Sequence, residues 1–142
     1  MRRSIGFLLA VLATAALSGA CDEDTPTDTP TTPTNPAIIT ETFAGAVNPN
    51  GAVTHSFTTE AAGTVTASLV AIGPDSATRI GLSIGTWNGL SCAINCGVAN
   101  DNAAQGVTVT GSASALGSFC VRIYDIGQLA GNISYEIRVT HP

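Results

Sequence analysis

The 142-residue sequence contains no lysine and few aromatic residues: four phenylalanines, two tyrosines and one tryptophan. Its five positive residues are all arginines, and ten acidic residues bring the formal charge to -5. Nucleic acids and anionic lipid head groups are recognised through basic surfaces. The charge balance therefore excludes both as partners of this chain.

The sequence also lacks an apolar run long enough for a transmembrane helix, which needs about 18 residues. The run over residues 5–17 has thirteen residues, follows the positive pair Arg2-Arg3, and precedes the small residues 18–20. These three parts are typical of a secretory signal peptide. With Cys21 directly after them, residues 1–20 resemble a bacterial lipoprotein signal, although Leu17 lies one position further from the cysteine than the usual leucine.

That resemblance implies a cut before Cys21 and two or three acyl chains on the cysteine, since a single chain gives only marginal attachment. Ordinary secretion after a nearby cut is the alternative. We expect an exported protein, lipid-anchored in the bacterial cell envelope, with the outer membrane or cell surface favoured over the inner membrane. Loss of Arg2 and Arg3 would leave three positive and ten acidic residues, a charge of -7.

Residues 22–36 read DEDTPTDTPTTPTNP, with four prolines and no apolar residue to bury. Proline disfavours both helix and sheet, and a segment without apolar residues cannot form a core. With Cys21, the segment predicts a disordered tether over residues 21–36, extended at about 3.1 Å per residue to about 45 Å. The following residues, 37–142, are enough for one domain with a modest core.

Six segments of this domain alternate apolar and polar residues with period two, and none shows a sustained helical period. Turn signals such as Asn48-Pro49-Asn50-Gly51 separate them. Short strands with one apolar face each predict an all-β fold, an antiparallel β-sandwich of about seven to nine strands. The alternating positions are Val53, His55 and Phe57; Val65, Ala67, Leu69 and Ala71; Ile80, Leu82 and Ile84; Val107 and Val109; Phe119, Val121 and Ile123; and Ile133, Tyr135, Ile137 and Val139.

Five of these runs resemble strands of the bacterial pre-peptidase C-terminal domain, namely residues 54–58, 63–69, 80–86, 118–125 and 133–139. The resemblance covers essentially the whole folded region and implies a jelly-roll-like sandwich. It also implies a non-catalytic accessory module that binds substrate or matrix, or assists secretion. Because no protease precedes the module in this sequence, we expect the lipid tether to position it instead.

With Cys21 lipidated, Cys92, Cys96 and Cys120 form an odd set in an oxidising compartment. A Cys92–Cys120 disulfide would stabilise the fold by about 3.6 kcal/mol, against about 2 kcal/mol for the short Cys92–Cys96 closure. We expect a bridge to Cys120, with Cys92 ahead of Cys96 as its partner.

Residues 81–85 match G-x-S-x-G, the nucleophile elbow in which a strand-to-helix turn exposes the serine. Here no helix follows, and Leu82 and Ile84 alternate with Ser83 as in a strand. A small hydrolase using Ser83 is therefore the weakest functional hypothesis. We predict no catalytic residue, no metal site and no cofactor.

His55 alternates with core residues and is expected to be a partly buried, hydrogen-bonded strand residue, whereas His141 is expected to fray at the chain end. Residues 100–102, with Gln105, are expected to form a loop. This loop lacks the alternating carboxylates and the terminal glutamate of a calcium site. The three cysteines and the two distant histidines are equally poor zinc ligands.

Trp87 falls on the opposite parity from the apolar residues of its segment. If the strand keeps its phase, the ring lies outside the core, where it can stack on a sugar or on an apolar residue of a partner. Alternatively, a bulge at Gly85 turns it inward, or it covers the Cys92 bridge. On the two closing strands we expect a cross-strand charge cluster of Arg122, Glu136 and Arg138.

The leading hypothesis is a non-enzymatic, lipid-tethered β-sandwich that binds a carbohydrate or an envelope protein through loops at one end. Its other partner would be the membrane, through the lipid on Cys21. A self-associating surface or filament subunit with exposed threonine-rich strands is the structural alternative. The candidate ligand contacts are Trp87, Asn100, Asp101 and Asn102.

Overall fold

The computed structural model describes residues 35–142, without the side chains of residues 95–97. The predicted signal peptide, the lipidation of Cys21 and nearly all of the predicted tether lie outside the described residues. The described residues belong to one compact unit that ends at Pro142. Among the described residues, no helix is long and apolar enough to cross a membrane.

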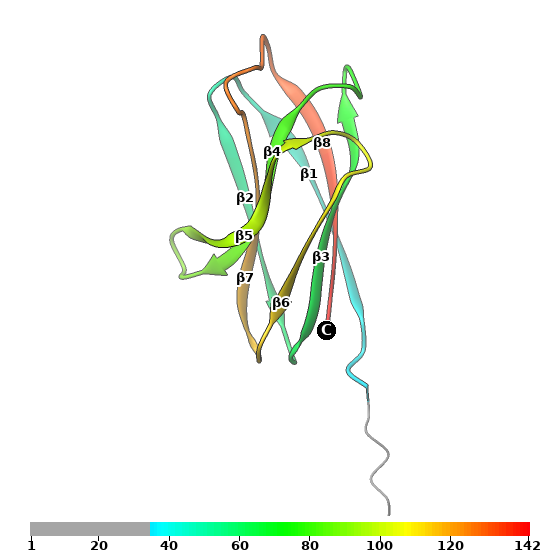
Figure 1. Cartoon of the computed structure of the whole chain (residues 1–142), viewed down its shortest axis with the longest axis vertical. Coiled ribbons are helices and arrows are strands. Elements are labelled where there is room, and N and C mark those ends of the chain that lie inside the picture. The colour runs from blue at the N-terminus through cyan, green and yellow to red at the C-terminus, as the bar shows by residue number, and fades with distance from the viewer. Residues whose placement is uncertain (1–34) are drawn as a thin grey trace, which may run out of the picture. The chain divides into compact units, whose positions relative to one another are not determined.

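Residues 35–142 form eight strands in two four-stranded sheets, and all neighbouring strands are antiparallel (Figure 1). The first sheet contains, in spatial order, β1 (Ile39–Val47), β8 (Ile133–His141), β3 (Gly63–Gly73) and β6 (Thr108–Ala113). The second sheet contains, in spatial order, β2 (Ala52–Thr59), β7 (Gly117–Tyr124), β4 (Ile80–Trp87) and β5 (Cys92–Ala103). This eight-stranded, two-sheet order is a jelly roll, so the predicted antiparallel sandwich is confirmed.

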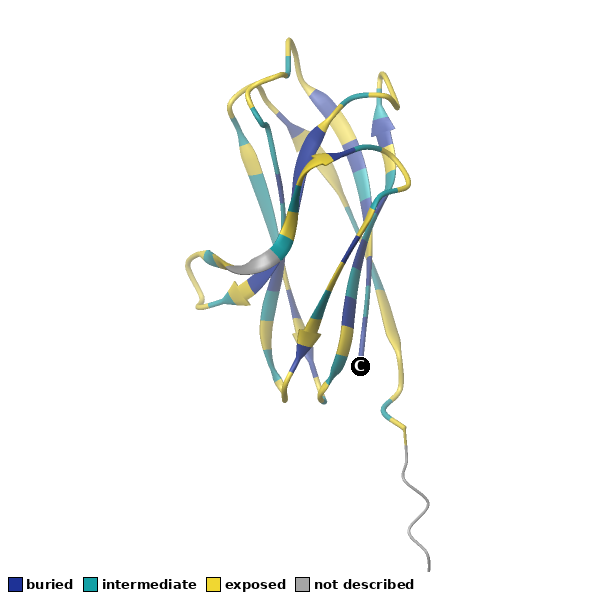
Figure 2. Ribbon diagram, in the orientation of Figure 1, coloured by how far each residue is buried: buried dark blue, intermediate teal, exposed yellow. Residues whose placement is uncertain are grey.

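The core lies between the two sheets and is made by the inward residues of the alternating strands (Figure 2). In β8 every second residue from Ile133 to His141 is buried, and the residues between them are not. Each fully buried leucine or isoleucine contributes about 1.5–3 kcal/mol relative to an exposed one. The period-two pattern thus marks the residues that hold the sheets together, and the largest aliphatic side chains that are completely buried are Leu69, Ile80, Leu82, Ile123 and Ile137.

Strand β3 departs from strict alternation near its end. Its register against β8 shifts between Leu69 and Ala71, which is a β-bulge with one extra residue. Ile72 is consequently buried and Ala71 is exposed. The prediction that Ala71 faces the core is wrong, because the bulge reverses the phase of the strand.

Strands β1 and β5 carry too little alternation to be predicted from the sequence. Strand β1 lies at a sheet edge, and Val47 is its one buried residue. Strand β5 runs to Ala103, so the predicted loop at residues 100–102 is wrong. The register between β4 and β5 shifts on both sides of Ser83, and these irregularities remove the period-two pattern from β5.

His141 continues the pattern of β8, and the prediction that it frays is wrong. Its side chain is 1% exposed, and its Nε2 lies 2.9 Å from Oε1 of Glu41 on β1. Its ring stacks on Phe57 with centroids 5.1 Å apart. Two residues beyond Val139 the chain again points inward, where β1 and β2 cover it.

The predicted charge cluster of Arg122, Glu136 and Arg138 is also wrong. Arg122 lies on β7 in the second sheet, whereas the other two residues lie on β8 in the first sheet. Consecutive strands of this topology belong to different sheets here, so the three side chains cannot be cross-strand neighbours. Among the described residues, the one close pair of opposite charge type is Glu41 with His141.

Four loops gather at the end of the sandwich opposite the start of β1: those between β1 and β2, β3 and β4, β5 and β6, and β7 and β8 (Figure 1). Asp125 joins two of them. Its Oδ1 accepts from three successive backbone N–H groups, those of residues 127–129, at 2.8, 2.9 and 3.1 Å. Its Oδ2 accepts from the backbone N–H of Asn50 at 2.7 Å. These hydrogen bonds, above all the one from Asn50, lower the pKa of Asp125.

Candidate functional site

The G-x-S-x-G run of residues 81–85 is a segment of β4, and both of its glycines lie on the outer face of the second sheet. Gly81 pairs with Tyr124 of β7, and Gly85 pairs with Cys120 of the same strand. A glycine within a strand often marks a close approach by another group. At both positions a side chain of β7 crosses over β4 and reaches β5, on the far side.

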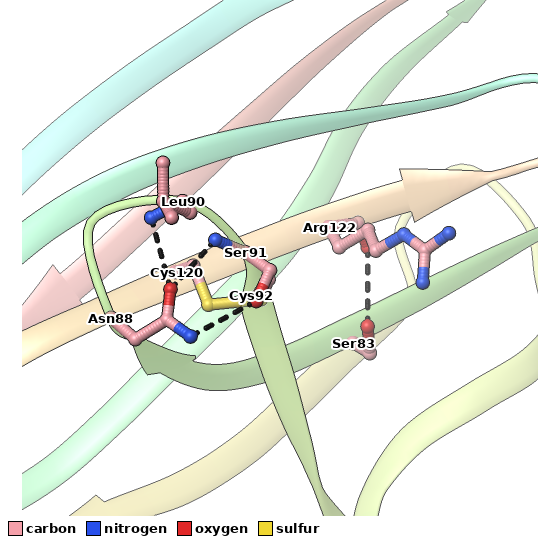
Figure 3. Close-up of a disulfide and its surroundings, with 7 residues drawn as sticks. All are labelled: Ser83, Asn88, Leu90, Ser91, Cys92, Cys120 and Arg122. Atoms are coloured by element: carbon pink, nitrogen blue, oxygen red, sulfur yellow. Dashed lines mark hydrogen bonds between the residues drawn. A yellow bond between two sulfur atoms is a disulfide. The ribbon is translucent and has the colours of Figure 1, made fainter.

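The crossing over Gly85 is covalent. Cys120 forms a disulfide with Cys92 at the start of β5, with Cα atoms 5.8 Å apart (Figure 3), so the predicted pairing is confirmed. A Cβ on Gly85 would lie 3.1 Å from Sγ of Cys92 and would overlap the carbonyl oxygen of Ala93. The sequence separation of 28 residues corresponds to a stabilisation of about 3.6 kcal/mol. The side chain of the third cysteine, Cys96, lies outside the described ones.

The crossing over Gly81 is a hydrogen bond. The Tyr124 ring occupies the space that a Cβ on Gly81 would fill, and its hydroxyl donates to Oδ1 of Asp101 on β5. Burial, and then the bonded Asp101 carboxylate, raise the pKa of Tyr124 to about 12. Asp101 therefore already has a partner within the fold.

Ser83 lies between the two crossings and is a strand residue, as predicted. It is fully buried, and its Oγ donates to the carbonyl oxygen of Arg122 at 3.5 Å (Figure 3). Strand β4 continues past it to Trp87, so there is no strand-to-helix elbow. His55, on β2, is half-buried as predicted, and its Nε2 lies 2.7 Å from Oη of Tyr135. Burial lowers the pKa of His55.

The turn between β4 and β5 is held by one asparagine side chain. Oδ1 of Asn88 accepts from the backbone N–H groups of Leu90 and Ser91 at 2.9 and 2.8 Å, and its Nδ2 donates to Oγ of Ser91 at 3.1 Å (Figure 3). Gly89 has φ +95°, a conformation that side-chain-bearing residues rarely adopt. The turn thus has a defined shape, with Leu90 92% exposed at its tip.

The disulfide places this turn over the outer face of β7 and β2, and in Figure 1 the hairpin projects sideways across these strands. Beneath it lies an open pocket of about 390 Å³. Trp87 is half-buried on its wall and is not part of the core. The bulge before Gly85 therefore does not turn Trp87 inward. The pocket is lined by Ala52, Thr54, Trp87, Leu90, Ser91, Cys92 and Arg122.

Only Trp87 of the predicted ligand contacts lines this pocket. Asn100, Asp101 and Asn102 do not, because they belong to the part of β5 that pairs with Ile80–Leu82, while Trp87 pairs with Cys92 at the other end. Oδ1 of Asn100 accepts from the backbone N–H of Asn102 at 2.8 Å. The expectation that both groups serve one end of the sandwich is wrong, since the loops before and after a strand lie at its opposite ends.

Sequence reasoning missed the other side chains of the pocket, above all Thr54, Ser91 and Arg122. Two signals could have found them. Thr54 and Arg122 both face outward by parity, and they are direct partners in the β2–β7 register. The predicted Cys92–Cys120 bridge also implies that the turn before Cys92, which contains Ser91, lies over that pair.

A second open pocket, of about 280 Å³, lies at the loop end between the β3–β4 and β7–β8 loops. Its lining has one charged residue, Asp75, and no aromatic ring. Oδ1 of Asp75 already accepts from the backbone N–H of Ala77 at 2.9 Å. This pocket has the polar side chains of Thr78, Gln128 and Asn132 as well, but it offers no ring for stacking and no cation.

Among the side chains that the structure describes, which leave out those of residues 95–97, there is no group of three or more His, Cys, Asp or Glu placed to hold a metal ion. No protein-family model matches the chain, and no curated protein matches it either. The pocket under the hairpin combines an indole ring with two hydroxyls and a guanidinium. This set can stack on an apolar face and form hydrogen bonds around it.

Proposed function

We propose that this protein is a lipid-anchored, extracytoplasmic binding module whose sandwich holds a saccharide beneath the β4–β5 hairpin without transforming it. The observation that carries the proposal is the position of Trp87. The ring is kept outside the core, next to a disulfide, on the wall of a pocket with Thr54, Ser91 and Arg122 as polar neighbours. The resemblance of the folded region to an accessory module supports a binding role rather than catalysis.

A sugar ring has an apolar face and a rim of hydroxyls. An aromatic side chain can cover the face while hydroxyl and guanidinium groups bond the rim, which is the usual make-up of a small-molecule site. The disulfide and the Asn88 turn hold these groups in place before the ligand arrives, so less entropy is lost on binding. A rigid, open pocket of this kind suits one or two sugar rings of a longer chain.

The test uses the fact that Trp87 is the only tryptophan. Tryptophan fluorescence of the full-length protein in detergent then reports on the pocket alone. We expect a saturable change in emission on titration with oligosaccharides of envelope or matrix polysaccharides. Trp87→Ala should abolish the binding measured by calorimetry.

Leu116→Ala is the matched control, because Leu116 is 70% exposed and lies outside the pocket. It should leave both the emission and the affinity unchanged. If saccharides bind Trp87→Ala as tightly as the original protein, or if none binds either protein, the proposed function is wrong.

The anchoring part of the proposal rests on the sequence around Cys21. Mass measurement of the mature N-terminus should show loss of residues 1–20 and acyl chains on Cys21. Cys21→Ser should release the protein from the membrane fraction. An unmodified N-terminus at another residue would contradict the anchor and leave the binding proposal standing.

A protein ligand is the second candidate, and Leu90 favours it. Its side chain is 92% exposed on a turn that Asn88 holds in one shape. A photo-crosslinking residue at position 90 should then give one defined adduct in intact cells. With the crosslinking residue at position 91 instead, the adduct should form when Leu90 is present and be lost in Leu90→Ser. An adduct between two copies of the chain would favour the self-associating subunit instead, and absence of any adduct would exclude both.

A further inference from the structure

Arg122 is the one charged residue in the pocket lining. Among the described residues, no carboxylate oxygen lies within 4.0 Å of its guanidinium. Its described neighbour is the Tyr124 ring, whose centroid is 5.4 Å from Cζ. The guanidinium therefore has no anion within the described part of the fold.

The other two arginines of the folded domain lie elsewhere. Arg79 is exposed, and its Nη1 donates to the carbonyl oxygen of Asn102 at 3.4 Å. Arg138 is exposed on the outer side of the other sheet. Arg122 alone is half-buried and lines a pocket. Because no carboxylate of the described residues pairs with this guanidinium, it can bind an anion from outside.

We infer that the saccharide held beneath the hairpin carries a carboxylate, as a uronic acid does, and that Arg122 binds this group while Trp87 stacks on the sugar ring. This inference rests on the proposed function. The planar guanidinium matches a carboxylate with two parallel hydrogen bonds. Ser91 adds a donor, because its Oγ accepts from Nδ2 of Asn88 and its own proton stays available.

The charge of the chain limits how many carboxylates the site accepts. The lining holds no second cation, and the formal charge of the whole chain is -5. A long polyanion would meet repulsion from the rest of the molecule. The fitting ligand has a single acidic sugar next to neutral ones.

The experiment compares matched pairs of ligands. The probes are disaccharides in which glucuronic, galacturonic or mannuronic acid is joined to a neutral sugar, each paired with its carboxyl-reduced form. We expect one acidic member to bind, and carboxyl reduction to weaken that binding about tenfold or more, the size of a charge-assisted hydrogen-bond pair. Added salt should weaken binding of the acidic disaccharide and leave binding of its carboxyl-reduced form unaffected.

Arg122→Gln should lower the affinity for the acidic ligand by the same factor. It should change the affinity for the neutral form less than about twofold. Arg122→Lys should fall between the two, because it keeps the charge and loses the planar fork. Arg79→Gln is the control outside the pocket and should change neither affinity. Circular dichroism of each variant verifies that the sandwich is intact.

The outcomes separate this inference from the proposed function. If acidic and reduced forms bind equally well and both need Trp87, the carboxylate inference is overturned and the binding function stands. If no member of any pair binds, the proposed function itself fails. If the tripeptide Gly-Glu-Gly binds as tightly as the acidic disaccharide, the ligand is an acidic peptide and the saccharide is wrong.

Discussion

Two side chains of β7 cross β4 to reach β5, and the two crossings have different consequences. Over Gly85, the Cys120 disulfide holds Cys92 and brings the following turn across the sheet. Over Gly81, the Tyr124 hydroxyl donates a hydrogen bond to Oδ1 of Asp101, so these two polar groups satisfy each other. The first crossing leaves Trp87 and Arg122 on the lining of a pocket, whereas at the second crossing the Tyr124 hydroxyl and one Asp101 oxygen bond each other. The covalent crossing therefore shapes a site, and the hydrogen-bonded crossing only ties two strands.

The largest effect is expected when the covalent crossing is removed. The double variant Cys92→Ala with Cys120→Ala should lower the free energy of unfolding by about 3.6 kcal/mol. It should also weaken saccharide binding, because the turn is no longer held over β7 and β2. Urea unfolding followed by circular dichroism measures the first effect, and titration with the saccharide followed by Trp87 fluorescence measures the second. An unchanged affinity in a folded double variant would show that the disulfide does not shape the pocket.

A methyl group at the same crossing should have the next largest effect. A Cβ at Gly85 would overlap the carbonyl oxygen of Ala93, which is backbone and cannot move aside cheaply. Gly85→Ala should therefore lower the free energy of unfolding by about 2 kcal/mol. Gly131→Ala is the matched control, since a Cβ there meets no atom within 4 Å. Equal unfolding midpoints for the two variants in urea would refute the close approach at Gly85.

Breaking the hydrogen-bonded crossing should cost less and should spare the site. Tyr124→Phe keeps the ring over Gly81 and removes the bond to Asp101, which water can then solvate. We expect a loss of about 1 kcal/mol in the free energy of unfolding. The affinity for the pocket ligand should stay within about twofold of the original. A loss of affinity as large as that of the double cysteine variant would mean that the two crossings do not differ in function.

The smallest expected effect is a pH dependence. The pKa of Tyr124 is raised to about 12 in the folded protein, above its ordinary value of about 10. The neutral phenol is thus favoured by folding, and its contribution to stability is present below about pH 10 and lost as the pH rises toward about 12. Unfolding in urea at about pH 9 and about pH 11 should show a steeper loss in the original protein than in Tyr124→Phe.

Some alkaline loss should remain in Tyr124→Phe, because burial also raises the pKa of Tyr135. The comparison therefore uses the difference between the two proteins at each pH. Identical slopes would show that the Tyr124 phenol is not held neutral by the crossing.

The parts of the fold that follow simple alternation could be predicted from the sequence. Strand β8 shows this well, since its apolar residues from Ile133 to Val139 are buried as expected. The prediction failed where an extra residue reverses the phase, as at Ala71 and Ile72, or where an edge strand such as β1 buries only Val47. Bulges depend on pairing with a partner strand, and one strand's sequence does not record them.

The candidate site was half predictable for the same reason. The parity of Trp87 and the Cys92–Cys120 pairing could be predicted from local patterns and closure entropy. The presence of Arg122 and Trp87 on one pocket depends on a turn that folds back across two strands. Only the three-dimensional path of the disulfide places that turn.

The two crossings also fix the number of residues that separate them on each strand. Gly81 and Gly85 face Tyr124 and Cys120, so the same interval separates the glycines on β4 and the crossing residues on β7. One residue inserted between them on either strand would move one crossing away from its glycine and turn the following side chains to the opposite face. A change of side chain between the crossings, such as Leu82→Ile, would leave this spacing intact, whereas an inserted or deleted residue would not.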